Sequence, residues 1–137
     1  MKFPKKYIIP GERKLHSGQK SKIFYDVNGM LTDNYYRDLI LNEIPISNHY
    51  VGIATGGALI GILVSKERQN SKFSMIKDRE LKGDLPLNDY LLIDDVTTTE
   101  RSLLEAIDII GKPPSGICVC VDRRLEKKLS IISVFEI

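Results

Sequence analysis

The stretch YLLIDDVTTTERSLLEAI, at residues 90–107, most narrows the folds that this chain can adopt. Residues 90–93 form a short apolar run, which predicts a buried strand. From Ser102 apolar residues recur at helical spacing, and Gly111 followed by two prolines predicts the end of a helix. A buried strand joined to a helix by a short polar turn is typical of α/β proteins, whose parallel sheets are covered on both faces.

The same alternation runs through the rest of the chain. Short runs rich in apolar and aromatic residues predict further strands, and longer segments with helical spacing or capping residues predict helices. The expected strands cover residues 22–27, 50–54, 73–76, 116–121 and 132–137, and the expected helices cover residues 32–44 and a segment that begins at Ala58. We therefore expect one α/β domain over residues 1–137, with a mostly parallel central sheet flanked by helices.

Composition excludes several classes of protein. The chain has 137 residues and a net charge of +2, which is too weak a charge for a nucleic-acid-binding surface. No apolar run is long enough to span a membrane and the N-terminus lacks the apolar core of a secretory leader, so we expect a cytoplasmic protein without membrane or nucleic-acid partners. Cys118 and Cys120 alternate within an apolar run, which favours two buried thiols on one face of a strand over a zinc site.

Two aspartates, Asp94 and Asp95, follow the strand at residues 90–93. Ligands of parallel sheets bind beyond the carboxyl ends of the strands, and two adjacent carboxylates there need a cation, such as hydrated Mg²⁺, or the hydroxyls of a sugar diol. The threonines at 97–99, Ser102 and the positive end of the following helix suit a phosphate. The pattern indicates a ribose 5-phosphate site. The alternative is that the hydroxyls only cap the helix and that the aspartates are solvated.

A second strand end meets the same edge of the expected sheet. Thr55, Gly56 and Gly57 follow the strand at residues 50–54, and paired glycines let a ligand approach the backbone closely. Neither a dinucleotide-binding fingerprint nor a P-loop is present. On its own the glycine pair is equally compatible with a tight turn that has no ligand.

The segment after residue 76 brings three cations, Lys77, Arg79 and Lys82, to this edge. It contains Gly83, and Leu81 is the one apolar residue between Lys77 and Asp84. A mobile basic loop of this kind could close on a polyphosphate and exclude water. The alternative is an ordinary solvated loop, because surface loops are usually polar.

Four segments, in order along the chain, resemble those of the type I phosphoribosyltransferases. YLLIDDVTTTERS resembles the family's motif for 5-phosphoribosyl-1-pyrophosphate (PRPP), and VGIATGGALIG resembles its pyrophosphate-binding loop. LHSGQKSKIFYDVNGMLTD resembles the N-terminal hood segment, and VCVDRRLEKKLSIISVFEI resembles the C-terminal ending. Within the family the chain is most similar to the orotate phosphoribosyltransferases. The resemblance implies the phosphoribosyltransferase fold, with a small hood formed by residues 1–31 and about 122–137.

The resemblance also implies a reaction, in which PRPP, with Mg²⁺ as cofactor, reacts with orotate to give orotidine 5-phosphate and pyrophosphate. A homodimer is expected by the same analogy. The catalytic residues would be Asp94, Asp95, Lys77, Arg79 and Lys82, with both aspartates binding Mg²⁺ through water. PRPP would be bound by Thr55, Gly56, Gly57, Val96, Thr97, Thr98, Thr99, Glu100, Arg101 and Ser102. The base would be bound by Lys20, Phe24, Tyr25, Thr98 and Arg123.

The chain departs from the family pattern in three places. Glu100 and Arg101 stand where glycine is expected, and Glu100 would bring a carboxylate beside a phosphate. The basic loop is short and lacks the family's histidine, and His16 replaces the usual lysine or arginine of the hood. These departures leave two alternatives open: a regulatory relative that binds PRPP or a nucleotide without turnover, and a phosphoribosyltransferase for another base. A phosphotransfer protein of the haloacid-dehalogenase or receiver type is excluded, because the chain has no D-x-D-x-T motif.

Overall fold

A six-stranded sheet forms the centre of the computed structural model, which describes residues 1–14 and 20–137. The strand order is β5-β4-β3-β6-β7-β8, and every neighbouring pair is parallel except β4 with β5. The strands are β3 (His49–Ile53), β4 (Lys72–Lys77), β5 (Glu80–Lys82), β6 (Leu91–Thr97), β7 (Gly116–Asp122) and β8 (Ile132–Phe135). The mostly parallel sheet expected from the sequence is confirmed.

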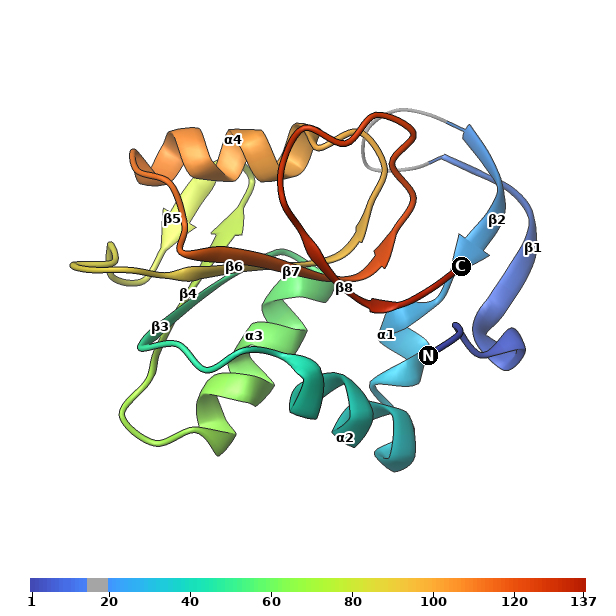
Figure 1. The fold of residues 1–137 in the computed structure, drawn as a ribbon, viewed down its shortest axis with the longest axis horizontal. Coiled ribbons are helices and arrows are strands. Elements are labelled where there is room, and N and C mark those ends of the chain that lie inside the picture. The colour runs from blue at the N-terminus through green and yellow to red at the C-terminus, as the bar shows by residue number, and fades with distance from the viewer. Residues whose placement is uncertain (15–19) are drawn as a thin grey trace.

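Helices cover both faces of this sheet (Figure 1). One face is covered by α2 (Asn34–Glu43) and α3 (Gly56–Glu67), with the short α1 (Val27–Met30) beside them, and the other face by α4 (Arg101–Ile110). Successive side chains of a strand point to opposite faces, so Ile93 of β6 packs in the α3 core and Leu92 packs in the α4 core. Within the described ranges no helix is long and apolar enough to cross a lipid bilayer.

The two cysteines lie two residues apart on β7 and face the same core. Cys118 and Cys120 are both buried in the α3-side cluster, as their alternation predicted. Burial raises the pKa of the Cys118 thiol to about 12, so this thiol is neutral at physiological pH. The two residues act as small core side chains.

A small antiparallel hairpin stands beside the sheet, formed by β1 (Ile8–Lys14) and β2 (Lys20–Tyr25) after the 3₁₀ turn η1 (Lys5–Tyr7). Figure 1 shows the two chain termini close together next to it. Lys2 forms a bridge with Glu136, and the ring of Phe3 packs edge-on against Tyr25 and Phe135. The hairpin matches the N-terminal part of the expected hood. The C-terminal strand β8 pairs instead with β7 of the main sheet, and the residue after it, Glu136, joins the N-terminal segment.

Three elements differ from the sequence-based expectation. β1 was not expected, because Pro10 and Gly11 lie inside it, and the strand accommodates them with an irregular register between residues 10 and 13. Residues 27–30 form a helical turn rather than the end of a strand, since Asp26 caps it by accepting the Gly29 N–H. The predicted loop after residue 76 contains a tight hairpin, in which Asp78 and Arg79 both adopt positive φ.

Candidate active site

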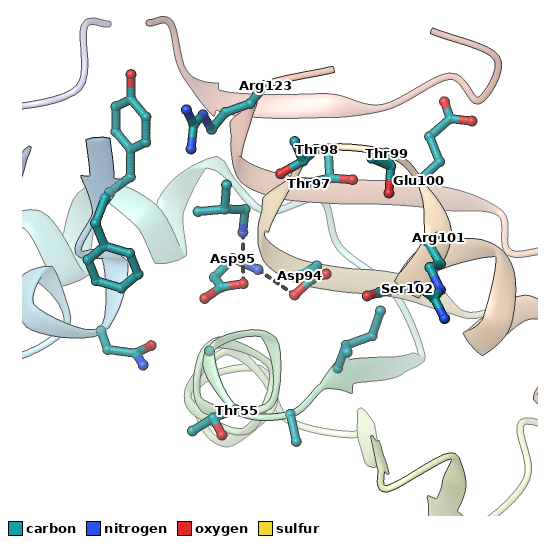
Figure 2. A pocket seen from close by; sticks show the side chains of 17 residues that line it. Thr55, Asp94, Asp95, Thr97, Thr98, Thr99, Glu100, Arg101, Ser102 and Arg123 are labelled. Carbon is teal, nitrogen blue, oxygen red and sulfur yellow. Dashed lines mark hydrogen bonds between the residues drawn. The ribbon is translucent and has the colours of Figure 1, made fainter. Parts of the chain in front are cut away.

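A pocket of about 270 Å³ lies where β3 and β6 end, and β2 of the hood contributes to one side of it. The sequence predicts ligand binding at this same edge of the sheet, beyond the carboxyl ends of the strands. Figure 2 shows the two aspartates between the threonine turn and Thr55. The predicted site residues that line the pocket are Phe24, Tyr25, Thr55, Gly56, Asp94, Asp95, Val96, Thr97, Thr98, Thr99, Glu100, Arg101, Ser102 and Arg123.

The acidic pair forms the centre of the pocket and lies within β6, two residues before its end. Asp94 is only 7% exposed. Asp94 Oδ1 accepts the Asp95 N–H and Asp95 Oδ1 accepts the Val96 N–H, both at 2.8 Å (Figure 2). Burial, together with the negative charge of Asp95, raises the pKa of Asp94 well above its ordinary value. Among the described residues no ion pair neutralises either aspartate, so a bound cation, or hydroxyls that donate hydrogen bonds, would compensate the charge.

The turn from β6 into α4 has the properties of a phosphate site. Glu100 is the N-cap residue of α4, and its side chain makes no capping hydrogen bond. Among the described residues no threonine or serine hydroxyl of this turn takes that place. The positive end of the α4 dipole therefore meets the hydroxyls of Thr97, Thr98 and Thr99 at the pocket, an arrangement that suits an anion. The alternative that these hydroxyls serve only as caps is supported by no capping bond in the described part of the chain, and their role at a phosphate stays a prediction.

The turn after β3 lies directly against the acidic pair. A Cβ atom on Gly56 would overlap the Asp95 carboxylate, and one on Gly57 would overlap the main chain of Ile93, so both positions need glycine. The peptide bond between Ala54 and Thr55 is cis. Thr55, the N-cap residue of α3, also makes no side-chain capping bond. A second helix therefore presents uncapped N–H groups at the pocket, while Gly57 packs beneath it and does not line it.

The hood side of the pocket carries aromatic rings and a cation. The Arg123 guanidinium lies 5.1 Å from the centre of the Tyr25 ring, and its Nη1 donates to Ile23 O at 3.3 Å. Phe24 lies beside them in β2. A flat ring could stack here next to a positive charge. Asn28 of α1 also lines the pocket and is not among the residues that the sequence predicts there. The strand predicted at residues 22–27 hides this helix, although the capping residue Asp26 is a signal for its start.

The side chain of Lys20, which is predicted to bind the base, lies outside the described residues, and so does all of His16, the departure in the hood. The role of Lys20 in binding the base stays a prediction.

The three predicted catalytic cations are not brought into this pocket. Lys77, Arg79 and Lys82 lie on the β4–β5 hairpin. Lys82 Nζ pairs with Glu80 at 2.6 Å, and Arg79 Nε lies 3.6 Å from Glu105 Oε1 of α4. Both ion pairs are exposed, so they hold the cations only weakly. Within one chain, these residues are therefore separate from the carboxylates that they were expected to assist.

The chain is 32% identical to the orotate phosphoribosyltransferase of Sulfurisphaera tokodaii over 158 aligned positions, which cover 96% of this chain and 80% of that protein. The chain belongs to the orotate phosphoribosyltransferase family. It is 27% identical to the Aeropyrum pernix orotate phosphoribosyltransferase, over 85% of this chain and 72% of that protein. The crystal structure of orotate phosphoribosyltransferase from Aeropyrum pernix superposes with a TM-score of 0.72 at 23% identity, over 85% of this chain and 76% of that one. No family model matches the chain.

Glu100 is the departure from the orotate phosphoribosyltransferase pattern that the structure explains best. Its φ of 64° is left-handed, a conformation that favours glycine. Its carboxylate points away from the aspartates (Figure 2), is buried, pairs with Arg124, and accepts the N–H groups of Lys128 and Leu129, both at 2.9 Å. Burial opposes its charge, but the bonds from Leu129, Arg124 and Lys128 outweigh burial and lower the pKa of Glu100. The repulsion of a phosphate expected from the sequence is thus wrong.

The close approach of Gly56 to Asp95 makes a direct prediction. Gly56→Ala should raise the KM for PRPP about tenfold or more, because the new methyl group must displace the Asp95 carboxylate. Steady-state kinetics would measure this. Gly111→Ala is a matched control at the far end of α4, where a Cβ meets open space but φ is 87°. The control should lower Tm and leave KM unchanged, and an unchanged KM in Gly56→Ala would contradict the prediction.

The raised pKa of Asp94 predicts that its ionised carboxylate lowers the stability of the folded chain at neutral pH. The pKa of Asp94 is higher in the folded chain than its ordinary value of 3.8. As the pH rises above 3.8, the unfolded chain therefore loses the Asp94 proton more readily, and the free energy of unfolding falls. At lower pH Asp94 is protonated in both states, and this loss of stability is absent. Asp94→Asn keeps the oxygen that accepts the Asp95 N–H. It should therefore raise Tm at pH 7, without ligands, by roughly 3 °C or more, and the gain should shrink as the pH falls towards 3.

Asp122→Asn is the control of opposite sign. Its hydrogen bonds with Arg124 lower the pKa of Asp122, so its ionised form stabilises the fold above the ordinary pKa and this contribution is lost as the pH falls. Asp122→Asn should lower Tm at pH 7. Thermal melts across pH 3–8 would compare the two variants, and a drop in Tm for Asp94→Asn at pH 7 would refute the interpretation of its pKa.

Proposed function

We propose that this chain transfers the 5-phosphoribosyl group of PRPP to orotate and releases pyrophosphate. The observation that carries the proposal is the position of Asp94 and Asp95 between the starts of α3 and α4, whose N-cap residues Thr55 and Glu100 make no side-chain capping bond. Such a pocket suits a molecule with hydroxyls in the middle and phosphates at both ends. PRPP has this arrangement, with a ribose diol between a 5-phosphate and a pyrophosphate.

Each part of the pocket then has a role. The turn from Thr97 to Ser102 binds the 5-phosphate, and the turn at Thr55 and Gly56 faces the pyrophosphate. Asp94 and Asp95 hold the ribose hydroxyls and favour positive charge on the sugar ring as the bond to pyrophosphate breaks. A ring nitrogen of the base forms the new bond to C1 of the ribose, so the protein needs no covalent nucleophile. Catalysis rests on orientation and on stabilising the charges that develop.

Arg123 favours orotate over an uncharged base. Orotate carries a carboxylate, and a guanidinium beside an aromatic ring can pair with that group while the ring stacks on the pyrimidine. Arg123 holds this position through the Tyr25 ring and Ile23 O. The family relationship points to the same base.

The acidic pair also fits Mg²⁺. Mg²⁺ is usually bound by one or two carboxylates and by substrate phosphates, with water completing its shell, and the described residues hold no group of three or more ligands that would form a cage of protein alone. Asp94 and Asp95 would hold the ion through water. When bound, the ion would neutralise charge on the pyrophosphate. The raised pKa of Asp94 is consistent with a carboxylate that binds a cation in the complete site.

A regulatory protein that binds PRPP without turnover is the second candidate. One observation favours it: the cations of the β4–β5 hairpin are paired with Glu80 and Glu105 rather than directed into the pocket of their own chain. Glu100, the other departure from the family pattern, gives this candidate no support because its charge is neutralised inside the protein.

We also infer a homodimer in which the hairpin of one chain serves the pocket of the other. Lys77, Arg79 and Lys82 need a second chain to act on a pyrophosphate, because their own pocket does not include them. Leu59 and Ile62, one turn apart on α3, are exposed apolar residues that a partner could cover. A cytoplasmic location belongs to the same proposal, since free buried cysteines suit a reducing compartment.

The proposed reaction is tested by pyrophosphate release with PRPP, Mg²⁺ and a panel of bases that includes orotate, uracil and adenine. Release with orotate alone is expected. Asp95→Asn should reduce turnover about a hundredfold or more while circular dichroism shows an intact fold, because the ribose then loses a charged partner. Binding of PRPP without release for any base would favour the regulatory candidate, and unchanged turnover in Asp95→Asn would remove its role at the ribose.

The shared site is tested by mixing two inactive variants. One carries Asp95→Asn, and the other carries alanine in place of Lys77, Arg79 and Lys82. If the hairpin acts across the dimer, random exchange gives mixed dimers with one complete site each, and about a quarter of wild-type turnover should return. As a control, the chain with all four changes is mixed with the Asp95→Asn chain and should regain nothing. No recovery in the first mixture would exclude a shared site.

A further inference from the structure

One segment, residues 122–129, holds the phosphate turn at both of its ends. At the beginning of the turn, β7 pairs with β6 up to Thr97 and Asp122, and the Arg123 N–H donates to Thr97 O at 2.8 Å. This main-chain bond fixes where the turn leaves the sheet. The donor of this bond is Arg123, whose side chain lies next to Tyr25, where the base is proposed to bind.

At the end of the turn, the same segment surrounds the Glu100 carboxylate. Glu100 Oε2 accepts from Arg124 Nη1 and from the N–H groups of Lys128 and Leu129. The Glu100 side chain is buried, and among described residues these three donors account for its hydrogen bonds. The position of Glu100 is thereby fixed by groups that lie outside the pocket.

Arg124 is itself held firmly. Its Nε and Nη2 donate to the two carboxylate oxygens of Asp122, both at 2.8 Å, and its Nη1 also donates to Leu129 O at 2.8 Å. Arg124 is 6% exposed, so the network lies out of water, where loss of one partner leaves a buried charge unpaired. A two-carboxylate clamp of this kind gives the guanidinium one orientation.

We propose that the Glu100–Arg124 ion pair is a positioning device that sets the phosphate turn and Arg123 as one unit. The inference rests on the proposed function. Neither side chain needs to touch a substrate: Glu100 keeps the turn in a left-handed conformation, and Arg124 keeps the neighbouring Arg123 at the base end. Loss of the pair should therefore weaken binding at both ends of the pocket, although the two ends bind different molecules.

The test measures KM for both substrates in variants of the pair. Glu100→Gly removes the carboxylate but suits the positive φ, so the backbone conformation itself is tolerated. It should raise the KM for PRPP and the KM for orotate, each by about tenfold. Arg124→Met should have a similar effect, and the double variant should be no worse than the worse single one. Glu100→Gln, which keeps an acceptor oxygen, should recover part of the loss.

Glu126→Gln is the matched control, a carboxylate of the same segment that is exposed and should leave both KM values unchanged. If Glu100→Gly lowers Tm but changes neither KM, the pair has only a structural role and the proposal fails. A rise confined to PRPP would also overturn it, because Arg123 would then be independent of the pair.

Calorimetry with ribose 5-phosphate separates this proposal from the proposed function. A wild-type chain that shows no turnover with any base but binds ribose 5-phosphate would refute the reaction only. In that case Glu100→Gly should still weaken ribose 5-phosphate binding about tenfold. Equal binding by the two chains, or no binding by wild type, would overturn the positioning role.

Discussion

The concentration of negative charge at the end of a buried strand is the constraint on which the rest of the site depends. β6 is one of the two central strands of the sheet, and its apolar first half places Asp94 where water cannot solvate it fully. Such a charge is tolerated only if other groups around it are arranged for a ligand that neutralises it. The glycine turn at Gly56 packs on this charge from one side, and the threonine turn follows it on the other.

Most of the fold could be predicted because each local signal agreed with the global arrangement. The apolar run before Asp94 and the helical spacing up to Gly111 predicted β6 and α4 within a few residues. Prediction failed where tertiary pairing decides the structure. β1 is a strand only because β2 lies beside it, and the β4–β5 turn forms although its residues, Asp78 and Arg79, are not glycine.

The candidate site was predictable to the extent that chain position dictates geometry. Parallel strands bring their carboxyl ends to one edge, so Asp94 and Thr55 had to meet once the sheet was recognised. The sequence could not show that the carboxylate of Glu100 turns away from the pocket into the protein, because its partner Arg124 is 24 residues away. Nor could it show that Lys77 stays outside the pocket, since that depends on how a hairpin folds back on β4.

Glu100 shows how a motif can lose its glycine without losing its shape. A non-glycine residue in the left-handed region costs roughly 1–2 kcal/mol, and a carboxylate beside a phosphate would cost more. Both costs are offset here by the same contacts, because the bonds that neutralise the carboxylate also draw it away from the pocket. Arg124 makes this possible only because Asp122 already fixes it at the end of β7. The presence of Glu100 in the phosphate turn therefore depends on the contacts of residues 122–129, and the two segments have to be interpreted together.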